Sequence, residues 1–140
     1  MGWTFYNASG QQLRNTGTVL ATQAEMETGT ALTSFVTPGR TQYHPGVSKG
    51  YCRITATGSL VAGSHNVSSV TDNGTGDYTV VWDTDFSNGN YSAPAQSADS
   101  GVQFIRCDNY ATGSVQIFSR DAGDSAASDS ATNIAAFGDQ

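Results

Sequence analysis

A predicted β-hairpin over residues 64–86 is the feature that most constrains how this chain can fold. Two runs rich in Val and Thr, residues 66–71 and 78–82, flank the segment DNGTGD. Asn73 and Gly74 in this segment are a turn signal, because both residue types tolerate the positive φ that a tight hairpin requires. The sequence therefore predicts two antiparallel strands that are joined at Asn73-Gly74.

The second strand of this hairpin has a hydrophobic pattern with a period of two. Tyr78, Val80 and Trp82 fall on one face of the strand, and the residues between them fall on the other. This alternation is typical of a half-buried antiparallel strand whose aromatic face other elements must cover. We therefore expect Trp82 to lie in the core of a β domain.

The composition favours an all-β protein with many turns. Only 13% of the 140 residues are charged, and Gly, Ser, Thr, Asn and Ala account for much of the remainder. Low charge with abundant Thr, Gly and aromatic residues indicates strands and turns and not a helical bundle. The expected fold is an antiparallel β-sandwich, preceded by a short N-terminal hairpin and a short helical joint. The low charge also suggests that partner chains cover part of the surface.

The charge balance argues against two classes of partner. The net charge is −6, and the six Lys and Arg residues form no cluster. Nucleic acid and anionic membrane surfaces are therefore poor partners. The chain also has no apolar run of about 18 residues, so no membrane insertion is predicted. Its N-terminus lacks the basic-then-apolar order of a secretion signal.

Residues 47–140 are predicted to form the antiparallel β domain. Besides the hairpin, strand-like runs occur at residues 49–55, 102–107, 114–119 and 132–137. Two polar segments are predicted to be exposed loops, residues 93–101 and 121–130. The segment SNGN at residues 87–90 predicts a second hairpin turn.

The two cysteines lie in strand-like contexts. Alternation within residues 49–55 places Tyr51 and Arg53 on one side of a strand and Cys52 on the other. A disulfide between Cys52 and Cys107 is possible in principle. Without a secretion signal, we expect two reduced and buried cysteines instead.

Residues 1–20 are predicted to be an attachment segment. Trp3, Phe5 and Tyr6 precede the turn-forming segment NASG, which predicts a short hairpin. A two-stranded ribbon cannot cover three aromatic side chains, and isolated hairpins are only marginally stable in water. Because exposed aromatic residues often anchor protein interfaces, we expect Trp3, Phe5 and Tyr6 to dock onto a partner protein.

Residues 21–46 are predicted to form a joint of two short capped helices. The segment TQAE that begins at Thr22 matches a capping box, and Gly29 is expected to end the first helix. Thr37 as the cap and Pro38 at the first helical position predict a second helix, which stops by the following Pro-Gly pair.

No catalytic, cofactor or metal site is predicted. His44 and His65 have no Cys, His or carboxylate neighbour at a zinc-like interval. Asp72, Asn73 and Asp77 could offer oxygens to calcium, but their spacing does not match an EF-hand loop and a turn explains the segment. The chain has no G-x-S-x-G segment and no cluster of titratable residues, so we expect a protein without enzymatic activity.

Parts of the chain resemble bacteriophage and prophage tail-fibre proteins. Residues 21–29 (ATQAEMETG) and 35–40 (FVTPGR) are similar to the A-(T/S)-Q-A-E-x-E-x-G…(V/M)-T-P-x-R junction of these fibres. Residues 43–49 (YHPGVSK), the hairpin at 66–80 and residues 134–138 (IAAFG) are similar to the β domain that often follows this junction. The resemblance implies a homotrimeric structural protein of the virion, assembled in the host bacterial cytoplasm. It supplies no catalytic residue.

The junction is the expected trimer joint. Phe35 and Val36 lack enough partners in so short a chain, so we expect them to contact other copies of the protein. Met26 and Pro38 belong to the same joint. An obligate homotrimer held together by these four residues is the prediction for the oligomeric state.

Three functions stay open at the level of the sequence. The leading expectation is a short fibre or spike, whose N-terminal segment docks on other virion proteins and whose β domain faces host-surface glycans. A capsid-attached head fibre or decoration protein is the alternative, because only about twenty residues precede the junction. A carbohydrate-binding module is the third, and the missing secretion signal counts against it.

Overall fold

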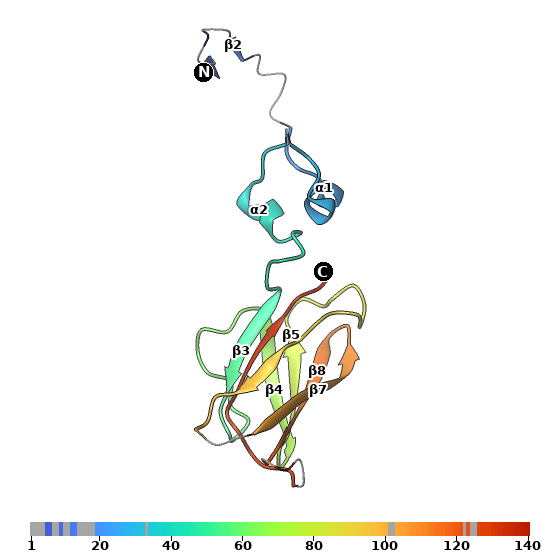
Figure 1. The fold of residues 1–140 in the computed structure, drawn as a ribbon. Helices are drawn as coiled ribbons and strands as arrows, with labels where there is room; N and C mark the ends of the chain where they lie inside the picture. The colour runs from blue at the N-terminus through green and yellow to red at the C-terminus, as the bar shows by residue number, and fades with distance from the viewer. Residues whose placement is uncertain are drawn as a thin grey trace. The chain divides into compact units, whose positions relative to one another are not determined.

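In the computed structural model, strands make up most of the regular structure and two short helices lie near the N-terminus (Figure 1). The structure describes residues 5–6, 9, 12–13, 19–32, 34–100, 103–121, 123 and 126–140. The chain divides into two units, Met1–His44 and Pro45–Gln140. Among the described residues, no helix combines the length and hydrophobicity needed to cross a bilayer.

The first unit contains one pair of short strands and both helices. β1 (Phe5–Tyr6) pairs antiparallel with β2 (Gln12–Leu13), so the two sides of the predicted N-terminal turn do pair. The helices are α1 (Gln23–Thr28) and α2 (Pro38–Thr41).

α1 begins and ends where its sequence signals predict. The Thr22 hydroxyl accepts a hydrogen bond from the Glu25 N–H (3.2 Å), and the Glu25 carboxylate accepts one from the Thr22 N–H (2.8 Å). These two bonds form the predicted capping box. Gly29 ends the helix with a φ of 64°, and its N–H donates to the Glu25 carbonyl (2.9 Å).

α2 follows its signals only in part. Pro38 occupies the first turn, as predicted, because a proline there gives up no helical hydrogen bond. Thr37 has the extended backbone of a cap but makes no side-chain capping bond. The helix ends at Thr41, so it stops by the Pro-Gly pair, as predicted.

The second unit is an all-β sandwich of two antiparallel sheets (Figure 1). The three-stranded sheet has the order β3-β9-β6 and consists of β3 (Gly50–Ile54), β9 (Thr132–Ala136) and β6 (Ala95–Ser97). The four-stranded sheet has the order β4-β5-β8-β7 and consists of β4 (Val67–Gly74), β5 (Asp77–Trp82), β8 (Ser114–Arg120) and β7 (Phe104–Ala111). The predicted strands outside the hairpin correspond to β3, β7, β8 and β9.

The hydrophobic core lies between the two sheets and confirms the predicted faces. Tyr78, Val80 and Trp82 of β5 are buried, together with Ile54 and Ile134 of the other sheet. On both β3 and β5, buried side chains alternate with more exposed ones, as a sheet with one covered face requires.

Trp82 sits in an aromatic cluster within this core. Its ring meets Phe86 edge to face at a centroid distance of 5.6 Å and Tyr91 at 6.1 Å. Its indole N–H donates to the Tyr91 hydroxyl (3.1 Å), which donates in turn to the Ser114 carbonyl (2.7 Å). The one polar atom of the buried indole is therefore satisfied.

The predicted turn of the central hairpin is wrong by two residues. β4 continues through Gly74, and Thr75-Gly76 forms the turn, with a φ of 65° at Gly76. Asn73 stays in the strand because its amide donates to the Asp77 carboxylate across the hairpin (3.0 Å). The Asn-Gly pair therefore supports the strand pairing and not the turn itself.

The connections also correct the sequence analysis. Residues 93–101 are not an exposed loop, because they contain β6, whose backbone pairs with β9. Residues 87–90 make no hairpin turn, since they lie in the long connection between β5 and β6, which belong to different sheets. Most described positions within residues 121–130 are exposed, as predicted, but Ser130 at the end of the segment is buried.

Candidate functional site

The residues predicted to form the trimer joint divide between buried and exposed positions. Met26 is buried, with 8% of its surface exposed. Phe35 and Val36 remain 64% and 53% exposed, and Pro38 is also exposed. A phenylalanine with most of its ring in water is a candidate contact residue, whereas Met26 supports the helix from inside.

The first unit exposes more apolar side chains than sequence reasoning identified. Val19, Leu20 and Leu32 are also exposed, Leu32 by 96%. We call Val19, Leu20, Leu32, Phe35 and Val36 the apolar joint. A sequence signal was available: all five residues lie outside any periodic helix or strand pattern. They therefore belong to no amphipathic face that the fold would bury.

Backbone hydrogen bonds hold two parts of the apolar joint side by side. Leu20 and Phe35 form a parallel bridge. The Phe35 N–H donates to the Val19 carbonyl (2.9 Å), and the Ala21 N–H donates to the Phe35 carbonyl (2.9 Å). The exposed side chains of Leu20 and Phe35 are therefore presented together.

Glu25 ties α1 to the segment that carries Phe35. Its carboxylate accepts hydrogen bonds from the Thr22 backbone (2.8 Å), the Thr22 hydroxyl (3.0 Å) and the Ser34 hydroxyl (3.2 Å). The Thr22 backbone bond, followed by the Thr22 hydroxyl, lowers the pKa of the Glu25 carboxyl from its ordinary value. The cap and the Ser34 contact are thus formed at neutral pH and weaken as the pH falls.

The structure describes less of the three residues that were predicted to dock onto a partner protein. Trp3 lies outside the described residues. Phe5 and Tyr6 form β1, whose backbone the structure describes but whose side chains it does not. Their role in docking stays a prediction.

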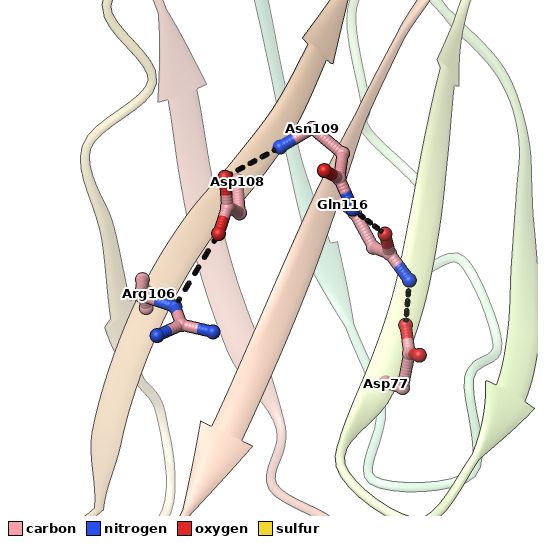
Figure 2. A network of polar contacts seen from close by, with 5 residues as sticks. All are labelled: Asp77, Arg106, Asp108, Asn109 and Gln116. Carbon is pink, nitrogen blue, oxygen red and sulfur yellow. Dashed lines mark hydrogen bonds and ion pairs between the residues drawn. The ribbon is translucent and has the colours of Figure 1, made fainter.

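A polar network crosses the outward face of the four-stranded sheet (Figure 2). Gln116 of β8 donates to the Asp77 carboxylate of β5 (2.7 Å) and accepts a hydrogen bond from the Asn109 amide of β7. Asp108 accepts from the Asn109 N–H (2.9 Å) and lies 3.8 Å from Arg106. These side chains satisfy one another, so the network stiffens the sheet and is not an open ligand site.

An aromatic contact completes this face. The Arg106 guanidinium lies over the Phe118 ring at 5.1 Å from its centroid, which adds a cation–π contact to its ion pair. Phe104, the neighbour of this pair, is 53% exposed. Arg106 is therefore held by two partners inside the domain.

The residues that the structure describes bring together no set of metal ligands. No group of three His, Cys, Asp or Glu residues there could hold a metal ion. Asp72 accepts from the Gly74 N–H (2.9 Å), and Asp77 accepts from Asn73 and Gln116, so these carboxylates already serve the hairpin.

Both cysteines are reduced thiols within the described part of the chain. Cys52 is buried and Cys107 is half-buried, and neither forms a disulfide. Burial raises the pKa of Cys52 to about 12 and that of Cys107 to about 11. Neither thiol is a reactive nucleophile at neutral pH.

No protein-family model, curated protein or solved structure matches the chain at a significant level.

Proposed function

We propose that this chain is a non-enzymatic structural protein of a phage virion, a short homotrimeric fibre or spike that is exposed on the particle and attaches it to the host surface. The observation that carries the proposal is the apolar joint. The trimeric state and the location on a virion are inferred from the resemblance of residues 21–40 to a tail-fibre junction.

The apolar joint supports self-association because exposed apolar side chains are concentrated there. Of the eight large hydrophobic residues exposed in the described chain, five belong to the joint. Exposed apolar side chains concentrated in one unit in this way favour an interaction surface. Copies of the same chain are the occupants that the junction resemblance indicates.

The size of the first unit supports the same conclusion. Met1–His44 is about as long as the shortest chains that can fold without a disulfide, a metal or a partner subunit. Both cysteines lie in the other unit, and the described residues of the first unit hold no metal-binding group. Association with further copies would add buried surface to so small a unit.

Light scattering combined with size-exclusion chromatography tests the oligomeric state. The purified protein should have the mass of three chains of 14.6 kDa at micromolar concentration. Phe35→Ser should shift the population toward monomer, because it removes the largest apolar side chain of the joint. Phe104→Ser is the matched control, since Phe104 is similarly exposed but lies in the second unit. A wild-type monomer would refute the trimeric fibre.

Deletion of residues 1–18 tests virion attachment. The deletion stops before Val19, because the backbone of Val19 pairs with Phe35 and belongs to the joint. The shortened protein should remain a trimer but no longer join particles that are assembled without the native protein. Normal incorporation of the shortened trimer would place attachment elsewhere in the chain.

A further inference from the structure

A pocket of about 300 Å³ opens on the outward side of the three-stranded sheet. We call it the Tyr51 pocket. Tyr51 and Arg53 of β3, Asn133 of β9 and residues 61–64 are among its lining. All of these residues lie in the second unit. Its volume matches the lower end of the range for small-molecule sites.

The backbone forms the wall of the pocket. The Val61 N–H donates to the Arg53 carbonyl (2.9 Å), and the His65 N–H donates to the Tyr51 carbonyl (2.9 Å). Residues 51–53 of β3, three in number, thus face the five residues 61–65 of the opposing segment, and residues 62–64 bulge away from the strand. Gly63 within this bulge has a φ of 94°, a conformation that favours glycine, and a Cβ added there would meet no neighbour within 4 Å.

Three side chains of different chemistry face this pocket. Tyr51 is 47% exposed, and its ring leans on His65 at a centroid distance of 5.7 Å, which leaves an aromatic surface in contact with solvent. Arg53 pairs in register with Asn133 on the neighbouring strand, so a guanidinium and an amide lie side by side next to the ring.

The Arg53 and Asn133 side chains have no internal partner in the described residues. No hydrogen bond or ion pair involves either of them there. Arg106 is different, because Asp108 and the Phe118 ring hold it in place. A pocket whose cation and amide are both available for contacts has the composition of a ligand site.

We propose that the Tyr51 pocket binds a carboxylate-bearing pyranose, the uronic acid class of sugar. The flat apolar face of such a ring fits the exposed face of Tyr51. The guanidinium of Arg53 matches a carboxylate through two parallel hydrogen bonds. The Asn133 amide can both donate to and accept from ring hydroxyls. The inference rests on the attachment function proposed above, for which it names the class of surface ligand.

Ligand-observed saturation-transfer NMR on the full-length protein tests the pocket. The probes are methyl glucuronide and methyl glucoside, which differ only at C6: the first has a carboxylate there and the second a hydroxymethyl group. The glucuronide should bind with a dissociation constant on the order of 1 mM, as expected for so small a ligand. The glucoside should bind at least about tenfold more weakly, because it lacks the charge-assisted bonds to Arg53.

Three variants locate the site. Arg53→Gln should remove the preference for the glucuronide, and Tyr51→Ala should weaken binding of both glycosides. Both side chains are exposed, so the variants should fold, which the melting curve checks. Arg106→Gln is the matched control, because it removes an exposed arginine from the other sheet and should leave binding unchanged.

The outcomes separate this inference from the proposed function. Equal binding of both glycosides, no binding, or full binding by Tyr51→Ala would overturn the assignment of the pocket and leave the trimeric fibre intact. A monomeric protein that binds the glucuronide through Arg53 would overturn the fibre and leave the pocket standing.

Discussion

The contact between Gly50 and Trp82 offers a sharp test of the core. A Cβ at Gly50 would lie 2.8 Å from Cζ3 and 3.1 Å from Cε3 of the Trp82 ring. The ring is buried and hydrogen-bonded, so it cannot move aside easily. Gly50→Ala should therefore destabilise the domain by about 1–3 kcal/mol, as overpacking of cores does.

Trp82→Ala removes the same contact from the other side. The change deletes a ring that is 97% shielded from solvent and should cost about 3–5 kcal/mol. In this background the added Cβ of Gly50→Ala no longer meets a ring, and its next neighbour is the His65 carbonyl at 3.5 Å. The second substitution should then be neutral or slightly stabilising, because alanine restricts the unfolded chain more than glycine does.

Thermal and urea unfolding of the four proteins, followed by circular dichroism at equal protein concentration, measures this cycle. Trp82→Ala alone should lower the melting temperature by at least about 12 °C, from the usual scaling for domains of this size. Gly39→Ala is the control, since Gly39 has open space and should not couple to residue 82. An equal cost of Gly50→Ala in both backgrounds, or a Trp82→Ala protein that melts normally, would refute the described core.

Two further predictions concern the central hairpin. In urea unfolding, Gly76→Ala should destabilise the protein far more than Gly74→Ala. Both glycines have a positive φ, but only at Gly76 would a Cβ collide with the backbone of β8. Equal losses of stability would contradict the described turn. Burial, assisted by the nearby Asp129 charge, raises the pKa of Tyr78 to about 12. The folded state therefore holds this proton more tightly than the unfolded chain does, so its stabilisation is complete below about pH 10 and lost from there to about pH 12. Urea midpoints measured across this range should fall with pH, and less steeply in Tyr78→Phe.

The strands with one covered face could be predicted from the sequence. In β5 and β3, side chains alternate between core and solvent, so the period of two in the sequence directly reflects burial. The ends of α1 were equally predictable, because Thr22, Glu25 and Gly29 act through bonds within a few residues of one another. Local chemistry and burial agree at these positions.

Elements held by distant backbone bonds could not be predicted. β6 is short and polar, so its side chains give no strand pattern. Its backbone pairing with β9 makes it a strand. The segment that ends at Ser130 was expected to be exposed, but Asp129 accepts hydrogen bonds from the Gly76 N–H (2.7 Å) and the Tyr78 hydroxyl (3.2 Å). A carboxylate that caps a turn more than fifty residues away leaves no local trace in the sequence.

The candidate sites show the same division. The sequence placed Tyr51 and Arg53 on one strand face, but the pocket beside them arises from the bulge at residues 62–64, which only the pairing with β3 reveals. It also identified Phe35 and Val36 as residues without partners, but not that Leu20 lies next to Phe35. The sequence therefore identified some residues of each site but not the residues that fold next to them, because contacts between distant segments have no local sequence signal.

The two units of the chain achieve burial in different ways, and this difference supports separate roles for them. The second unit covers its own core from both sheets and keeps polar or isolated aromatic groups outside. The first unit covers Ala21 and Met26 but leaves the apolar joint exposed, so under the proposed trimer its stability should rise with protein concentration. A β domain that folds around its own core can present a ligand pocket in a fixed shape. If the joint associates as proposed, it would bring several such pockets together, and this would raise weak affinities for a repetitive surface.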